Sequence, residues 1–256
     1  MNLSGKVALV TGGLGDLGNE MALHLALDGA TVALWDIKSK AESKERVQRV
    51  EFAGGKVLYQ KVDISNRKQV DAGVTALVEE LGGLDIVCAN AGIVESKPFL
   101  EIPQDNWQRH MDVNLTGTFN VGQAVARQMV KAGTQGRIIL TSSWVADIPW
   151  PENTAYNTTK AGVNMLMKQM ARELAQYGIR VNAVAPGIVK AGLAGKQLRE
   201  EPQYAVRVSK VIPLGEPGTP TEIGQAVVYL AGPMTSYMTG SVLLLDGGCS
   251  LFQFDN

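Results

Sequence analysis

The sequence has few of the residues that disulfide frameworks and metal centres require. Its 256 residues include two cysteines, Cys88 and Cys249, and two histidines, His24 and His110. Two cysteines exclude a disulfide framework and are typical of reduced thiols in a cytosolic protein. Two histidines exclude a three-histidine site, and we expect no metal in the active site.

An excess of charge of one sign and long apolar runs are also lacking. The chain has 24 basic and 25 acidic residues, a net charge of −1, which gives no footprint for nucleic acid or an anionic membrane. No apolar run approaches about 18 residues, and residues 1–6 lack the apolar core of a signal peptide. Since 45% of the residues are apolar, we expect a globular, cytoplasmic protein.

Seven short apolar runs alternate with longer amphipathic segments. The runs are residues 7–10, 31–35, 57–59, 85–88, 137–140, 180–184 and 241–245. They are continuous rather than alternating, which is typical of parallel strands covered on both faces. Apolar residues recur at helical spacing between them, at Val70, Val74, Leu77 and Leu81 and at Val163, Met167, Met170 and Leu174. Strands separated by helices predict an α/β fold with seven parallel strands and helices on both faces.

No linker or change of composition divides the chain, so we expect a single domain over residues 1–256. Residues 188–218 interrupt the regular alternation with three prolines and four glycines. Ligands bind beyond the carboxyl ends of the strands in such sheets, so an insertion there predicts a substrate lid. The alternative is a solvated connector.

A glycine-rich turn follows the first strand. Residues Gly13, Gly15 and Gly18 match the dinucleotide fingerprint G-x-G-x-x-G, in which small residues let a pyrophosphate approach a helix amino end. This predicts a Rossmann-like, doubly wound sheet. Asp36 ends the second strand, where a carboxylate accepts hydrogen bonds from the adenosine ribose and repels a 2′-phosphate, so we expect NAD. Alternatively, Asp36 caps a helix before Ser39.

Tyr156 and Lys160 are four residues apart on a predicted helix and share a face. A phenol has a pKa near ~10, and a neighbouring ammonium group lowers that pKa by stabilising the phenolate. Tyr156 is therefore a candidate acid/base. By itself, such a pair is common and carries little information.

Several motifs accompany this pair, namely Thr11–Gly18, Asn90-Ala91-Gly92, Asn114, Ser143, Tyr156-Asn157-Thr158-Thr159-Lys160 and Pro186-Gly187. Together they resemble the short-chain dehydrogenase/reductase family from about residue 3 to about residue 249. The resemblance implies a nicotinamide-dependent oxidoreductase of seven parallel strands that assembles as a homotetramer.

The resemblance also implies the roles of individual residues. Tyr156 would transfer the proton, and Lys160 would lower its pKa and bind the nicotinamide ribose. Ser143 would bind the substrate oxygen, and Asn114 would hold a water of the proton relay. The implied cofactor-binding residues are Gly12, Gly15, Asp16, Leu17, Gly18, Asp36, Asp63, Ile64, Asn90, Gly92, Tyr156, Lys160, Pro186, Gly187 and Val189. Among these, Asp63 and Ile64 would flank the adenine, and Val189 would contact the carboxamide.

The chain departs from the family pattern at two positions. Asp16 stands where the family usually has a glycine, which brings negative charge close to a pyrophosphate. Ala191 stands where a threonine often binds the carboxamide, so one cofactor contact is expected to be missing or replaced.

The substrate is less clearly indicated. Trp144 and Trp150 lie between Ser143 and Tyr156, and their flat faces suit a sugar, polyol or cyclic alcohol; alternatively, they pack beneath the lid. We therefore expect oxidation of a small secondary alcohol with NAD, without nucleic-acid or membrane partners.

Two other functions are possible on the same fold. In 3-oxoacyl reductases, which act on acyl-carrier-protein or CoA thioesters, basic residues commonly dock the acidic carrier. The matching positions here are Thr134 and Tyr177, which are not basic. These reductases also usually use NADPH, and Asp36 argues against that cofactor. A non-catalytic nucleotide-binding regulator is a more remote alternative, because such proteins typically lose the tyrosine or the lysine.

Overall fold

A computed structural model describes residues 2–251; Met1 and residues 252–256, which the predicted domain includes, lie outside the described part. The strands are β1 (Val7–Thr11), β2 (Thr31–Asp36), β3 (Val57–Lys61), β4 (Ile86–Ala89), β5 (Arg137–Thr141), β6 (Arg180–Pro186) and β7 (Val242–Leu245). They form one parallel sheet in the order β3-β2-β1-β4-β5-β6-β7. The prediction of seven parallel strands is confirmed, with strand ends shifted by two residues at most.

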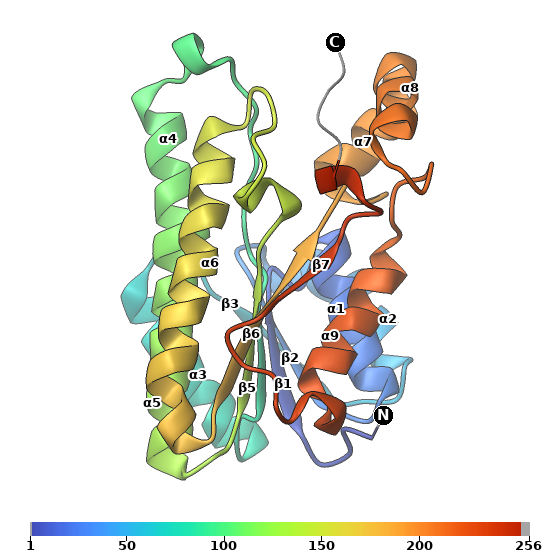
Figure 1. The fold of residues 1–256 in the computed structure, drawn as a ribbon. Helices are drawn as coiled ribbons and strands as arrows, with labels where there is room; N and C mark the ends of the chain where they lie inside the picture. Colours follow the sequence, from blue (N-terminus) through green and yellow to red (C-terminus); the bar gives the residue numbers. More distant parts are fainter. Residues whose placement is uncertain (1, 252–256) are drawn as a thin grey trace.

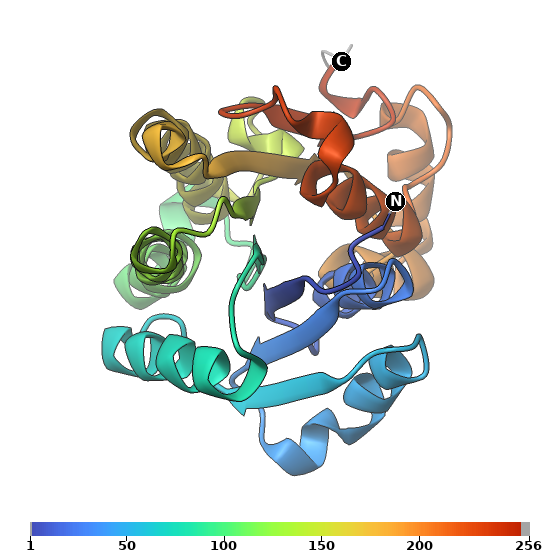
Figure 2. The same cartoon turned by 90° about the horizontal axis from the view of Figure 1, so that it is seen from below.

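Helices cover both faces of the sheet, as Figures 1 and 2 show. One face carries α1 (Asp16–Leu27), α2 (Lys40–Glu51) and α9 (Pro220–Ala231), and the other carries α3 (Arg67–Leu81), α5 (Thr118–Ala132) and α6 (Thr154–Leu174). Further helices are α4 (Gln104–His110), α7 (Gly192–Glu200) and α8 (Pro202–Val211), a π-helical turn at Met111–Gly117, and short 3-10 turns at Phe99–Glu101, Trp144–Ala146, Ala175–Tyr177, Pro233–Thr235 and Cys249–Leu251. No helix within residues 2–251 has the length and apolarity needed to span a bilayer.

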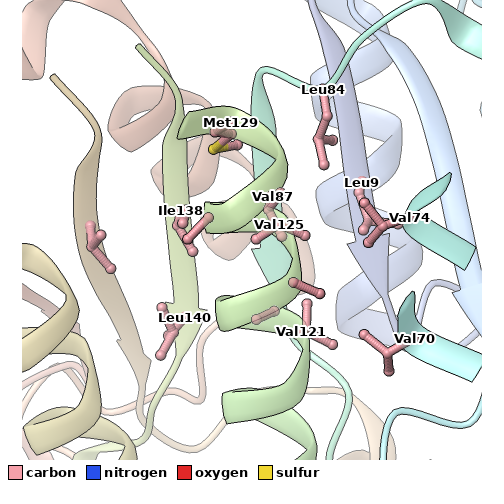
Figure 3. Close-up of a cluster of buried hydrophobic side chains, with 14 of the residues drawn as sticks. Leu9, Val70, Val74, Leu84, Val87, Val121, Val125, Met129, Ile138 and Leu140 are labelled. Atoms are coloured by element: carbon pink, nitrogen blue, oxygen red, sulfur yellow. The ribbon is translucent and has the colours of Figure 1, made fainter. Parts of the chain in front are cut away.

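The core explains why the strand sequences are continuously apolar. In β1, Leu9 packs toward α3 and α5, whereas its neighbour Val10 belongs to the cluster that packs beneath α1 and α9. Figure 3 shows the first of these clusters, with Val121, Val125 and Met129 of α5 lying over the sheet. Each of these side chains is fully buried, and such burial stabilises the fold by roughly 1.5–3 kcal/mol per side chain.

The topology places a crevice at the carboxyl ends of β1 and β4. The chain runs from β1 outward to β3, and then returns to the other side of β1 to form β4. Connections therefore leave neighbouring strands in opposite directions at this point, and open α/β sheets bind ligands at such a switch. Both the glycine-rich turn and Asn90 follow these two strands.

Candidate active site

Close backbone packing shapes the glycine-rich turn. A Cβ atom on Gly18 would lie 2.2 Å from the carbonyl oxygen of Gly12, and one on Gly12 would lie 2.9 Å from the Cα of Ala91. Gly12 also has a φ of +64°, which favours glycine. At Gly15, the added Cβ would meet only this same oxygen, at 3.4 Å. The turn is thus packed against the segment after β4 and leaves the amino end of α1 facing the crevice.

Side-chain hydrogen bonds tie the carboxyl ends of three strands together. The Thr11 hydroxyl accepts hydrogen bonds from the backbone N–H groups of Asn90 and Ala91, both at 3.0 Å. The Asn90 amide donates to the Thr11 carbonyl at 3.1 Å, and its oxygen accepts from the Thr141 hydroxyl at 3.2 Å. These bonds fix the floor of the crevice across β1, β4 and β5.

The crevice holds a cavity of about 370 Å³, within the size range of small-molecule and cofactor sites. The predicted residues that line it are Gly12, Gly15, Asp16, Leu17, Gly18, Asp36, Asn90, Gly92, Ser143, Tyr156, Lys160, Pro186, Gly187 and Val189. Further lining residues are Ala91, Ile93, Val94, Thr141, Ser142 and residues 191–194; of these, the sequence singled out only Ala91, within a motif, and Ala191, as a departure from the family pattern. The others are mostly sequence neighbours of the motif residues, and their small, apolar or hydroxyl side chains carry no distinctive sequence signal.

Two predicted adenine contacts lie outside this lining. The Asp63 carboxylate accepts hydrogen bonds from the backbone N–H and the hydroxyl of Ser65, at 2.9 and 2.7 Å. Ile64 is 5% exposed and packs in the core beneath α3 and α5. Their contact with the adenine stays a prediction.

Asp36 lies at the cavity and does not cap a helix. One of its oxygens accepts a hydrogen bond from the backbone N–H of Leu14 at 3.1 Å. The other oxygen accepts one from the backbone N–H of Lys38 at 3.3 Å. Helix α2 is capped instead by Ser39, whose hydroxyl accepts from Glu42 in a capping box. The helix-cap alternative for Asp36 is therefore wrong, and Asp36 lines the cavity; its contact with the adenosine ribose stays a prediction.

Tyr156, Ser143 and Lys160 meet on the opposite side of the cavity. Burial raises the pKa of Tyr156, and a hydrogen bond with the Ser143 side chain acts in the opposite direction. The Lys160 ammonium lies 5.4 Å from the centre of the Tyr156 ring, and burial lowers its pKa to about 8. Burial is the larger influence on Tyr156 in this structure, and the expected stabilisation of its phenolate by Lys160 stays a prediction.

Asn114 sits in the π-helical turn behind the cavity. Its side-chain oxygen accepts from the backbone N–H of Ile93 at 2.8 Å, and its amide donates to the Ile93 carbonyl at 2.9 Å and to the Thr159 hydroxyl at 3.2 Å. Its own backbone carbonyl accepts from Thr118 at 2.7 Å. Asn114 therefore positions the segment after β4, and its part in a proton relay stays a prediction.

A second, smaller cavity of about 140 Å³ adjoins Ser143 and Tyr156. Trp144 and Trp150 line it and pack edge-to-face, with ring centres 5.2 Å apart. From α8, Tyr204 lines the same cavity, and the guanidinium of Arg207 lies 4.5 Å from the centre of the Trp150 ring. The tryptophans thus both border the cavity and pack in one apolar cluster with residues of α7 and α8, such as Leu198 and Val208.

The described residues fit a dinucleotide better than a metal ion. Within residues 2–251, no group of three or more His, Cys, Asp or Glu side chains is placed to hold a metal. The turn, by contrast, offers a helix amino end beside glycines that admit no Cβ, with a carboxylate at the end of the neighbouring strand.

Comparison with known proteins agrees with this geometry. A family model described as enoyl-(acyl carrier protein) reductase matches residues 14–250. The crystal structure of a short-chain type dehydrogenase/reductase from Mycobacterium marinum is 38% identical with a TM-score of 0.91, over 97% of this chain and 96% of that chain. The chain belongs to the short-chain dehydrogenase/reductase family.

Other members of the short-chain dehydrogenase/reductase family are similarly close. A 3beta-hydroxysteroid dehydrogenase 1 from Eggerthella lenta is 36% identical over 99% of this chain and 98% of the relative. A 3-oxoacyl-(acyl-carrier-protein) reductase from Thermotoga maritima is 37% identical over 97% of this chain and 99% of the relative. The structure of an NAD⁺-bound xylitol dehydrogenase is 31% identical with a TM-score of 0.92, over 97% of this chain and 100% of that chain. This short-chain dehydrogenase/reductase is an oxidoreductase that acts on CH–OH groups.

Proposed function

We propose that the protein uses NAD to interconvert a small, neutral secondary alcohol and its carbonyl compound. The alcohol is of the sugar, polyol or monocyclic type. The observation that carries this proposal is the composition of the smaller cavity beside Ser143 and Tyr156. No Asp, Glu, Lys, Arg or His side chain of the described residues lines it. A carboxylate or phosphate substrate would find no charged partner among these lining residues, and removing a charge from water without such a partner is unfavourable.

The size of this cavity supports a compact substrate. Its volume of about 140 Å³ lies below the range of roughly 300–1,000 Å³ that is typical of sites for drug-sized ligands. A single ring or a short polyol is a better match to this volume than a fused-ring steroid. The indole faces of Trp144 and Trp150 suit the C–H surface of such a ring.

The chemistry divides between the cofactor and the chain. A bound nicotinamide accepts or returns the hydride. The Tyr156 hydroxyl removes the proton of the substrate alcohol, a role supported by the fact that Tyr156 lines both cavities. Ser143, which lines both cavities and hydrogen bonds with Tyr156, orients the substrate oxygen. Lys160 supplies positive charge beneath the phenol, which favours the phenolate.

The preference for NAD rests on Asp36. Its carboxylate stands at the cavity at the end of β2, where a 2′-phosphate would meet a like charge. The NAD⁺-bound xylitol dehydrogenase of the same fold supports this choice. We propose further that residues 1–256 form one domain, that residues 188–218 act as the lid, and that the protein is a cytoplasmic homotetramer.

A screen of substrates with both cofactors tests the proposal. Sugars, polyols, monocyclic alcohols and hydroxyacyl thioesters would be offered with NAD and NADP, and reduced cofactor would be followed by its absorbance. We expect turnover of neutral, compact alcohols with NAD. Efficient turnover of hydroxyacyl thioesters with NADP would favour the 3-oxoacyl reductase alternative, which the similarity to the Thermotoga maritima enzyme supports. Nucleotide binding without any turnover would favour a regulator.

A further inference from the structure

Asp16 connects three distant parts of the chain. It is the first residue of α1, and one carboxylate oxygen accepts a hydrogen bond from the Arg46 guanidinium of α2 at 2.7 Å. The other oxygen accepts from the backbone N–H of Gly192 at 2.9 Å. Gly192 is the first residue of α7 in the lid and lies 176 residues away in sequence. The carboxylate therefore bridges the glycine-rich turn and the lid.

The carboxylate occupies a place that suits an anion. The first N–H groups of a helix have no partner within the helix and carry partial positive charge. The amino ends of α1 and α7 both line the 370 Å³ cavity, through residues 16–18 and 192–194. Helix α7 has no side-chain cap at Ala191 and no acidic residue in its first turn. Asp16 supplies its capping acceptor from another element.

The charge of Asp16 is matched to these partners. The Gly192 N–H, followed by the Arg46 guanidinium, lowers the pKa of Asp16 against the opposing effect of burial. The carboxylate is thus ionised at neutral pH, and Arg46 remains as its counter-ion if the bond to Gly192 opens. The Asp16 side chain is 43% exposed, so water can solvate its carboxylate when the bond to Gly192 opens.

We propose that Asp16 is a built-in competitor for the diphosphate of the dinucleotide. In the free protein its carboxylate accepts the hydrogen bond from the Gly192 N–H at the amino end of α7. When a diphosphate binds there, this hydrogen bond breaks and the diphosphate takes the place of the carboxylate. Asp16 then sets the affinity for the cofactor and links its binding to the lid. This inference rests on the proposed function, because it requires a dinucleotide in the larger cavity.

Ligands that differ in the diphosphate test the competition. Dissociation constants of NAD, ADP-ribose and adenosine would be measured for the wild type and for Asp16→Ala. We expect the variant to bind NAD and ADP-ribose about fivefold to tenfold more tightly, with adenosine unchanged within about twofold. Asp16→Asn, which removes the charge and retains an acceptor oxygen, should bind the diphosphate ligands with intermediate affinity.

A matched control separates competition from a change in total charge. Asp71→Ala removes a carboxylate that is 52% exposed, against 43% for Asp16, and that also pairs with an arginine, Arg67 at 2.9 Å, on α3. It should leave all three dissociation constants unchanged. Hydrogen exchange over residues 192–200 should accelerate in free Asp16→Ala and slow again with ADP-ribose, because the diphosphate replaces the lost cap.

The outcomes distinguish this inference from the proposed function. Unchanged or weaker binding of NAD and ADP-ribose by Asp16→Ala would overturn the competition, as would an equal gain for adenosine. If the wild type prefers NADP or oxidises no alcohol, the proposed function fails. The tighter binding of ADP-ribose by Asp16→Ala would still support the competition in that case.

Discussion

Lys160 donates a hydrogen bond from Nζ to the backbone carbonyl oxygen of Thr141 at 2.7 Å. The lysine is 4% exposed, and within residues 2–251 no carboxylate forms an ion pair with it. Burying a cation without a counter-ion is unfavourable, and burial accordingly lowers the pKa of Lys160 to about 8. The carbonyl of β5 thus holds a positive charge beneath Tyr156 at the expense of stability.

Replacing this lysine should stabilise the protein while removing its activity. The pKa of Lys160 falls from 10.5 to about 8 on folding, which corresponds to roughly 3 kcal/mol at about 1.4 kcal/mol per unit. Lys160→Met removes this cost but also loses the hydrogen bond to the Thr141 carbonyl. We therefore expect the free energy of unfolding to rise by about 1–2 kcal/mol at pH 7. Urea unfolding of the wild type and of Lys160→Met would measure this difference in stability.

The pH dependence of that gain identifies its cause. Between pH 8 and 10.5 the unfolded wild type binds more protons than the folded one, so wild-type stability rises with pH in this window. The advantage of Lys160→Met should therefore be greatest below pH 8 and shrink toward pH 10.5. Lys168→Met, at an exposed position of the same helix, should show neither effect. A gain that is equal at every pH would assign it to packing instead.

Loss of the Tyr156 hydroxyl should abolish turnover but not cofactor binding. In Tyr156→Phe the ring still fills its place, and the cofactor cavity keeps its other lining residues. Removal of a general acid/base typically costs 10²–10⁴-fold in rate. We expect kcat to fall by at least about a hundredfold and the Kd of NAD to stay within a few-fold. Tyr177→Phe, at an exposed tyrosine, is the control. A Tyr156→Phe variant with a tenth of the wild-type rate would exclude this role.

Much of the fold follows from local sequence signals. Continuous apolar runs predict parallel strands because both faces of the sheet are buried, as Leu9 and Val10 show on opposite faces of β1. Residues 188–218, in contrast, read as an irregular insertion, and the structure forms α7 and α8 there. Pro202, one of the three prolines of this segment, occupies the first turn of α8, where its missing N–H is tolerated.

Within the site, sequence spacing predicts which residues gather but not how they bind one another. Motif residues such as Gly12, Ser143 and Lys160 line one cavity, whereas Asn114, Asp63 and Ile64 are not among the residues that line it. The bonds that Asp16 makes to Arg46 and Gly192, and the packing of Arg207 on Trp150, join elements far apart in the chain. No local periodicity encodes such contacts, because they depend on the angle at which separate helices meet.

Removal of the Asp36 carboxylate should narrow the preference between cofactors. We expect the wild type to prefer NAD over NADP by at least about tenfold in kcat/KM, which requires only ~1.4 kcal/mol. Two charges a few ångströms apart repel by about 4 kcal/mol at an effective dielectric of ~20, before screening. Asp36→Ala should therefore improve NADP and weaken NAD, whereas Glu45→Ala on α2 should change neither. Equal wild-type efficiency with both cofactors would show that Asp36 does not face the ribose.

The contact between Arg207 and Trp150 should affect the substrate rather than the cofactor. The guanidinium lies 4.5 Å from the centre of an indole that lines the smaller cavity and does not line the larger one. A cation–π pair at an exposed site contributes about 0.5–1 kcal/mol. Arg207→Ala should therefore raise KM for the alcohol about twofold to fivefold, with kcat and the Kd of NAD nearly unchanged.

Two further variants show whether the stacking itself is responsible. Arg207→Lys keeps the charge and loses the planar group that lies over the ring, so we expect an intermediate KM. Lys210→Ala removes an exposed cation from the last turn of the same helix and should leave KM unchanged. If KM rose equally in Lys210→Ala and Arg207→Ala, the effect would come from the charge of α8 rather than from its contact with Trp150. If KM were unchanged in Arg207→Ala, the lid would be held over the substrate by its apolar contacts, such as that of Val208 in the same cluster as Trp150.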